Sequence, residues 1–198
     1  LHISRRKCKM WVKIIVASIP AGVVGILWDD VFTKYFYNYQ TVAIMLILVG
    51  VVFIIIERSN KNKIAKIDSI DDISYGQAFL IGVFQMIAAI FPGTSRSGST
   101  IVGSLMLGIS RTAAAEFTFF LAVPAMFGGS AIKILKYSGG FNSAEVALLA
   151  IGMIVAFVLS IIAIKFLMSY IKKHDFKVFG YYRIVLGILV ILYALFLA

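Results

Sequence analysis

Long apolar runs recur along the whole chain, and they restrict its fold more than any other feature does. A helix needs roughly 20 apolar residues to cross the hydrocarbon core of a bilayer. Apolar residues fill 61% of the 198 positions and charged residues only 14%, against roughly 25% charge in a typical soluble domain. The runs occupy residues 14–28, 41–56, 76–91, 101–109, 117–132, 146–164 and 179–197. The sequence therefore predicts an all-α integral membrane protein.

The remaining composition excludes several other classes of protein. Sixteen glycines, three prolines and one cysteine rule out collagen-like, disordered and disulfide-rich chains. The 19 Lys and Arg residues against nine Asp and Glu residues give a net charge of +10, which in a soluble protein would suggest nucleic acid. The basic residues lie between the apolar runs, so lipid head groups and membrane orientation explain them. Nucleic acid is therefore not an expected partner.

The basic segments orient the apolar runs in the membrane. Cytoplasmic loops of membrane proteins carry an excess of Lys and Arg. Residues 1–12, 57–75 and 169–178 are rich in these residues, whereas 29–39 and 137–144 together contain a single one. We therefore expect the first three segments in the cytoplasm and the other two outside.

In this orientation the segment 76–110 begins and ends on the cytoplasmic side. Its second apolar limb has about 10 residues, which as a helix rise only about 15 Å and cannot cross the bilayer. The segment is therefore predicted to be a re-entrant helical hairpin with its tip at membrane depth, and two tight crossings are the alternative. The other runs give five transmembrane helices.

The predicted hairpin tip, residues 92–100, reads Pro-Gly-Thr-Ser-Arg-Ser-Gly-Ser-Thr. Pro and Gly end the first limb, and the serines can cap the helix that follows. Arg96 is the only charge between Asp72 and Arg111, and a charge inside a membrane is costly and usually marks function. Free helix N–H groups, hydroxyls and an arginine suit a phosphate or a carboxylate. The alternative is an interfacial loop in which the serines only cap.

The candidate site residues all belong to this hairpin. We expect catalytic roles for Arg96, Ser95 and Thr100, and substrate-binding roles for Gly93, Ser97 and Gln85. Thr100 would share a helical face with Arg96, since it follows four residues later. Gln85 would either line the cavity or form a hydrogen bond with a neighbouring helix.

Two expectations concern residues outside the hairpin. Arg183 lies near the cytoplasmic end of the last run, and it is expected to extend toward the membrane surface without a functional role. Residues 57–72 are rich in charged side chains and are expected to form a solvated cytoplasmic loop.

Several motifs resemble the BacA-type undecaprenyl-pyrophosphate phosphatases. The family pattern P-G-x-S-R-S-x-x-T occurs at 92–100, and further matches occur at 75–79, 82–85, 110–111, 115–117, 121–124 and 182–183. The resemblance covers the whole chain. It implies a bacterial cytoplasmic-membrane enzyme that hydrolyses undecaprenyl diphosphate to undecaprenyl phosphate and inorganic phosphate. The enzyme would thereby recycle the lipid carrier of peptidoglycan synthesis and confer bacitracin resistance.

The same resemblance implies an inverted-topology repeat in which two hairpin tips meet near the midplane. Residues 76–198 would form a complete second repeat, with the hairpin 76–110 and three spans, and residues 1–75 would hold the last two spans of the first. The first hairpin, with the family's E-x-x-x-E and S-S-x-G-H elements, would then lie outside this chain. It would supply the general base and the ligands of an expected Mg²⁺ or Ca²⁺ ion. No metal ligand is assigned within residues 1–198, and the chain alone is expected to be inactive.

A polyprenyl-phosphate transporter or flippase is the competing function. Inverted repeats with broken helices and anion sites at half-helix ends also occur in secondary transporters. A scaffold role is a weaker third option, and the sequence leaves a homodimer open. Release of inorganic phosphate from a polyprenyl diphosphate would distinguish the enzyme from the transporter.

Overall fold

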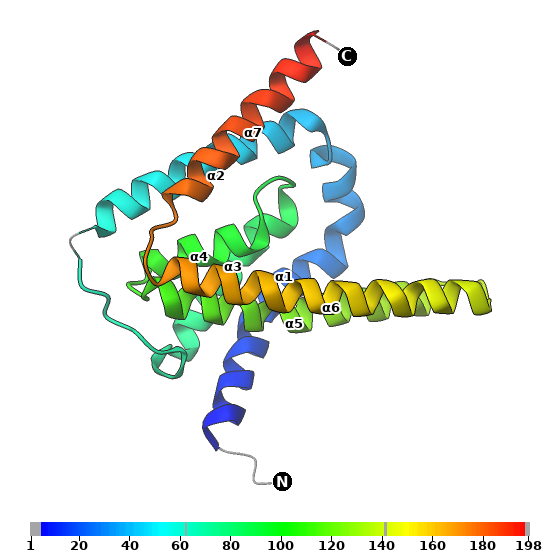
Figure 1. Cartoon of the computed structure of the whole chain (residues 1–198), viewed down its shortest axis with the longest axis horizontal. Coiled ribbons are helices and arrows are strands. Elements are labelled where there is room, and N and C mark those ends of the chain that lie inside the picture. The colour runs from blue at the N-terminus through cyan, green and yellow to red at the C-terminus, as the bar shows by residue number, and fades with distance from the viewer. Residues whose placement is uncertain (1–4, 62, 141, 197–198) are drawn as a thin grey trace.

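The computed structural model describes residues 5–61, 63–140 and 142–196, and most of them are helical (Figure 1). The elements are α1 (Arg5–Phe36), α2 (Tyr39–Asn60), the short 3₁₀ helix η1 (Ile70–Asp72), α3 (Tyr75–Ile90), α4 (Arg96–Met106), α5 (Arg111–Lys136), α6 (Ser143–Ile171) and α7 (Lys177–Phe196). Within the described part of the chain, five helices are long and apolar enough to cross a membrane, namely α1, α2, α5, α6 and α7. The predicted all-α integral membrane fold is confirmed.

Helix α1 is longer than the sequence pattern indicated. The segment 29–39 was expected to be an external loop, but α1 continues to Phe36 and only two residues separate it from α2. No glycine or proline interrupts residues 29–36, so nothing in the local sequence ends the helix. The Phe36 ring also packs edge-on against Phe91 beside the hairpin tip, at 4.9 Å between ring centroids.

Helices α3 and α4 form the expected hairpin in the middle of the molecule (Figure 1). The 11 residues of α4 rise about 16 Å, roughly half of a bilayer's hydrocarbon thickness. Helix α1 packs along α3, and α2 and α5 both contact α4. The broken backbone at the tip is only partly covered by protein, since Thr94 is buried but Arg96 and Ser97 are exposed. Irregular backbone is tolerated at membrane depth where it is buried in protein or lines a water-filled cavity.

Close backbone contacts hold the hairpin in place. A Cβ atom on Gly82 of α3 would lie 2.2 Å from the Ala17 carbonyl oxygen of α1. A Cβ atom on Gly93 would lie 2.5 Å from the Val42 carbonyl oxygen of α2. Gly93 also has φ +88, a conformation that glycine adopts without a steric penalty. The turn therefore needs a glycine at position 93 for its own geometry, in addition to any contact that Gly93 makes with a ligand.

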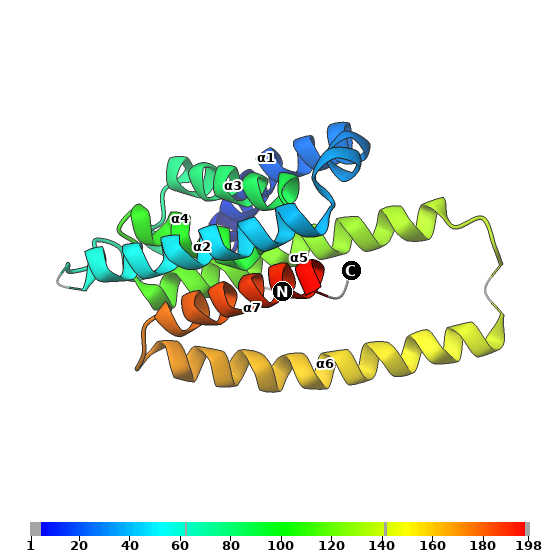
Figure 2. The ribbon, with the colours of Figure 1, turned by 90° about the horizontal axis from the view of Figure 1, so that it is seen from above.

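The last helices differ in how they pack. Helix α7 runs alongside α2, whereas α6 lies apart from the bundle along most of its length (Figure 2). None of the most apolar 18-residue window of α6 is buried. Only its C-terminal end, at Leu167, Met168 and Ile171, packs against core residues such as Phe53 and Phe176. A long apolar face of α6 is therefore free to contact lipid or further protein.

A buried ion pair joins α2, α5 and the loop before α7. Glu57 was expected in a solvated loop, but its side chain is fully buried and pairs with Arg111. The single Nε–H of Arg111 is shared between the two carboxylate oxygens, and Nη2 donates to Oε2. Glu57 also accepts a hydrogen bond from the Phe176 backbone N–H at 3.1 Å. In the loop before α7, partial burial raises the pKa of the Asp175 carboxyl, but hydrogen bonds from Lys177 together with the charges of Lys177 and Arg111 outweigh it and keep the pKa below its usual value. Because Glu57 is buried, residues 57–72 are not uniformly solvated.

Replacing Glu57 by glutamine is expected to destabilise the fold by about 2 kcal/mol. Breaking a fully buried pair costs about 3–5 kcal/mol, and the expected loss is smaller because the Arg111 side chain is 36% exposed to water. The midpoint of thermal unfolding in detergent should fall by about 4–8 °C. The exposed Asp68→Asn variant removes a similar charge and should leave the midpoint unchanged. Equal midpoints for both variants would contradict a stabilising role for this pair.

Candidate anion site at the hairpin tip

The turn between α3 and α4 is built to begin a helix. Ser95 caps α4, and its Oγ accepts a hydrogen bond from the Gly98 N–H at 3.2 Å. The Ser95 and Ser97 hydroxyl oxygens lie 3.2 Å apart. Ser95 has φ +64, the only positive φ of a non-glycine residue in the described chain. Such strained conformations persist only where surrounding contacts hold them in place, and they cluster at functional sites.

Arg183 of α7 supplies contacts to this turn that the sequence did not predict. Its Nη1 donates to the carbonyl oxygens of Gly93 and Thr94, at 3.2 Å each. The expectation that Arg183 only extends to the membrane surface is wrong, because its guanidinium turns inward to the exposed carbonyls of the turn. The hydroxyl of Thr94 is buried there and has no hydrogen-bond partner among the described residues.

A cavity of about 210 Å³ lies beside the tip, between α3, α4 and α5. Four of the six predicted site residues line it, namely Gln85, Arg96, Ser97 and Thr100. The other two, Gly93 and Ser95, lie in the adjoining turn and do not line the cavity. The side chain of Gln85 is buried, and of its two alternatives the structure supports the one in which it lines the cavity.

Thr100 is a buried residue that lines this cavity. Its Oγ1 lies 3.1 Å from the carbonyl oxygens of Arg96 and Ser97 and 2.9 Å from Oγ1 of Thr118. A hydroxyl has one proton, so Thr100 donates to one of these groups at a time and can accept from another. Thr118 was not among the predicted residues, although it stands out as the one hydroxyl in the apolar run 117–123.

Arg96 carries the positive charge of the cavity. Its side chain is exposed, and no carboxylate in the described ranges forms an ion pair with it. The residues that line the cavity include no Asp or Glu. The planar guanidinium fork is therefore available to an anion, and its geometry matches a phosphate or a carboxylate.

The residues of this site do not fit a divalent cation by themselves. Mg²⁺ and Ca²⁺ require several oxygen ligands, usually with one or more carboxylates. The side chains that line the cavity offer only amide and hydroxyl oxygens beside the cationic Arg96. No group of three His, Cys, Asp or Glu side chains comes together elsewhere in the described residues.

Replacing Arg183 by leucine is expected to loosen the tip locally. Losing hydrogen bonds from a charged donor to two carbonyl groups costs about 2 kcal/mol, which corresponds to a roughly 30-fold rise in local opening. Hydrogen–deuterium exchange of the backbone amides in residues 94–98 measures this opening directly. Arg58→Leu, which removes an exposed arginine from α2, should leave exchange at the tip unchanged. Unchanged exchange in the Arg183→Leu variant would show that these hydrogen bonds do not hold the turn.

The fold and the site define a class: a multi-pass helical membrane protein with a cationic, hydroxyl-lined cavity at the tip of a helical hairpin. The chain belongs to the BacA family, since the family profile described as "Bacitracin resistance protein BacA" matches residues 2–189.

Curated relatives carry the name undecaprenyl-diphosphatase. The protein of that name from Desulfitobacterium hafniense is 62% identical over 193 residues, which cover 98% of this chain and 69% of the relative. Undecaprenyl-diphosphatase 1 of Clostridium acetobutylicum is 57% identical over 194 residues, covering 98% and 71% of the two chains. The protein from Acetivibrio thermocellus is 52% identical, with the same two coverages of 98% and 71%. This chain thus spans about 70% of the length of these relatives.

Proposed function

We propose that this chain provides the diphosphate-binding part of an enzyme that hydrolyses undecaprenyl diphosphate to undecaprenyl phosphate and inorganic phosphate in the bacterial cytoplasmic membrane. The observation that carries the proposal is the cavity at the hairpin tip, where Arg96, Ser97 and Thr100 converge without any carboxylate. The membership of the BacA family and the names of the relatives supply the substrate. The product would return the lipid carrier to peptidoglycan synthesis, and the activity would confer bacitracin resistance.

The chain's own residues would bind the diphosphate and stabilise the charge that develops as the phosphoryl group is transferred. In such reactions, positioning and electrostatic stabilisation supply most of the catalysis. The guanidinium of Arg96 would donate to two phosphate oxygens, and the hydroxyls of Ser97 and Thr100 would contact the others. The start of α4 adds the positive end of a helix dipole. Ser95 and Gly93 would hold the turn in the conformation that presents these donors.

The acid–base groups would come from a segment beyond this chain. The cavity contains no histidine or carboxylate that could take a proton from water. We assign this role, and the ligands of the expected Mg²⁺ or Ca²⁺ ion, to the first hairpin that the family resemblance implies. When bound, the cation would neutralise charge on the diphosphate.

The packing of α1 and α6 supports this assignment. In an inverted repeat of the proposed kind, residues 1–75 end a first repeat and 76–198 form the second, so α1 and α6 would be equivalent helices. Helix α1 packs along the hairpin helix α3, whereas α6 has a long apolar face without a protein partner in the described chain. A first hairpin packed on α6 would repeat the contact of α1 with α3.

Phosphate release tests the enzyme against the transporter. The test uses the extended protein, defined as this chain preceded by the N-terminal segment of the Desulfitobacterium relative. In detergent with a divalent cation, it should release inorganic phosphate from undecaprenyl diphosphate, and mass spectrometry should detect undecaprenyl phosphate in equal amount. Exchange of the lipid across a proteoliposome membrane without phosphate release would favour the transporter and overturn the proposed hydrolysis.

A further inference from the structure

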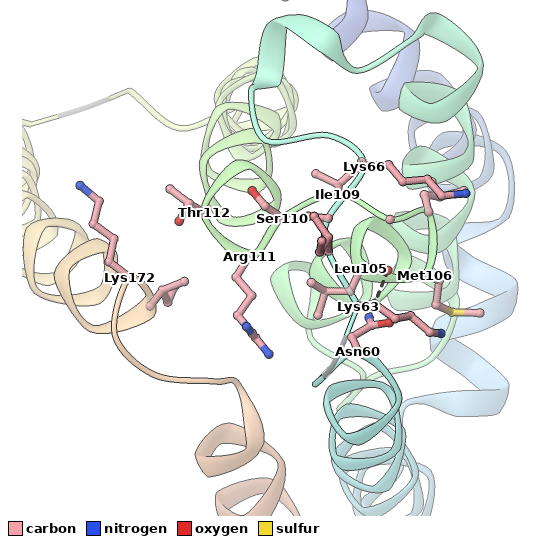
Figure 3. A pocket seen from close by; sticks show the side chains of 15 residues that line it. Asn60, Lys63, Lys66, Leu105, Met106, Ile109, Ser110, Arg111, Thr112 and Lys172 are labelled. Carbon is pink, nitrogen blue, oxygen red and sulfur yellow. Dashed lines mark hydrogen bonds between the residues drawn. The ribbon is translucent and has the colours of Figure 1, made fainter.

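A second cavity lies at the other end of α4 (Figure 3). It has a volume of about 590 Å³ and is bordered by the C-terminal ends of α2 and α6, the loop after α2 and the junction of α4 with α5. Arg96 lines the first cavity and Leu105 the second, and the helix rises about 14 Å from one to the other. The two cavities are therefore distinct. The basic loops that border the second one belong to the side assigned to the cytoplasm.

The charged side chains that line this cavity are all basic. They are Lys63, Lys66, Arg111 and Lys172, and no Asp or Glu is among the lining residues. The ion pair with Glu57 neutralises Arg111 from the inner side. The three lysines are exposed, and none of them forms an ion pair within the described ranges. The mouth of the cavity therefore carries three uncompensated positive charges.

The lysines stand on two sides of the cavity, and the ammonium ends of Lys172 and Lys66 point away from Arg111 (Figure 3). Figure 3 shows Lys172 on one side of Arg111, and Lys63 and Lys66 on the other. Of these three, Lys63 makes one weak hydrogen bond, to the Ser59 hydroxyl at 3.3 Å. Lysine side chains are long and flexible, so these ammonium groups can turn over the mouth to meet an anion.

Apolar side chains lie directly beside the lysines. Ile64 is 94% exposed and Met106 is 61% exposed, and both line the cavity. A free phosphate ion would leave these side chains in contact with water. An amphiphile with a phosphate group and an acyl chain would meet the lysines and the apolar surface together.

We propose that this cavity binds the phosphate group of an anionic phospholipid from the cytoplasmic leaflet. Basic pockets between transmembrane helices on the cytoplasmic side commonly hold such head groups. The acyl chain would lie along Ile64 and Met106, and the phosphate would lie between Lys172 and the Lys63–Lys66 pair. This site is independent of the hydrolysis proposed at the hairpin tip.

Native mass spectrometry of the detergent-solubilised protein tests the site with phosphatidylglycerol as the probe. The variant Lys63→Gln/Lys66→Gln/Lys172→Gln should bind this lipid about 100-fold more weakly than the unchanged protein, since each basic residue contributes about fivefold. The matched control, Arg58→Gln/Lys61→Gln/Lys173→Gln, removes the same charge from exposed residues that do not line the cavity. It should bind phosphatidylglycerol like the unchanged protein, and phosphatidylcholine should bind all three proteins equally weakly.

Three results would overturn the proposal. Equal losses in the two triple variants would mean that surface charge alone attracts the lipid. If excess inorganic phosphate competes for the site and phosphatidylglycerol binds no better than phosphatidylcholine, the ligand of the cavity is a free anion and not a lipid. Loss of the lipid preference in the extended protein would mean that the added segment fills the cavity. Melting curves of both triple variants check that each one is folded.

Discussion

The 198-residue chain alone is expected to release no phosphate from undecaprenyl diphosphate, whereas the extended protein releases it with multiple turnovers. The physical reason is that the cavity at the hairpin tip contains donors for the phosphate but no group that can activate water. The measurement is inorganic phosphate formed per mole of purified protein, in detergent and with a divalent cation present.

A control separates chemistry from folding in this comparison. Replacing both glutamates of the E-x-x-x-E element in the added segment by glutamine should abolish release, while the segment still packs on α6. Protection of α6 against hydrogen–deuterium exchange reports that packing, because the helix is exposed along its apolar window in this chain. Phosphate release by the 198-residue chain alone would contradict the proposed division between the two segments.

Replacing Arg96 by alanine in the extended protein is expected to lower kcat/KM by about 10²–10³-fold, the usual cost of removing one preorganised donor to a developing charge. The loss should fall on kcat as well as on KM, because the guanidinium would contact charge that grows during the reaction. Initial rates of phosphate release over a range of lipid concentrations give both constants. Arg96→Lys should recover only part of the activity, since lysine restores the charge without the planar fork.

Arg58→Ala is the matched control for this variant. Arg58 is also exposed, but it lines neither cavity. Its removal should leave both kinetic constants unchanged. A folded Arg96→Ala protein with kcat/KM close to that of Arg58→Ala would show that Arg96 is not the phosphate clamp.

Local sequence signals predicted the parts of the fold that depend on nearby residues. The apolar runs predicted the five long helices, and the short second limb with its Pro-Gly interruption predicted the hairpin. Arg96 is the single charge in that segment, which predicted a functional role for it. The structure places Arg96 in the cavity with Gln85, Ser97 and Thr100. The four predicted residues of the cavity all belong to this one hairpin, so their signals lie close together in the sequence.

The interactions that were missed join residues far apart in the sequence. Arg183 donates to carbonyls 89 and 90 residues away, and Glu57 accepts from Arg111 at a separation of 54 residues. Hydrophobic periodicity assigns a residue to an element, but it does not determine which other element lies beside it. Arg183 and Glu57 lie near helix ends, where charged side chains usually reach water. Only the packing of α7 and α5 on their neighbours turns these two residues inward.

Binding of a short-chain polyprenyl diphosphate to the 198-residue chain tests the central claim most directly, because it needs only the hairpin tip. Isothermal titration calorimetry in detergent should show saturable binding of the diphosphate, and Arg96→Ala should weaken it by about 10–100-fold, the usual contribution of a charged hydrogen bond. Arg58→Ala should leave the affinity unchanged. Equal affinities for the unchanged chain and a folded Arg96→Ala chain would contradict the assignment of the hairpin tip as the diphosphate site.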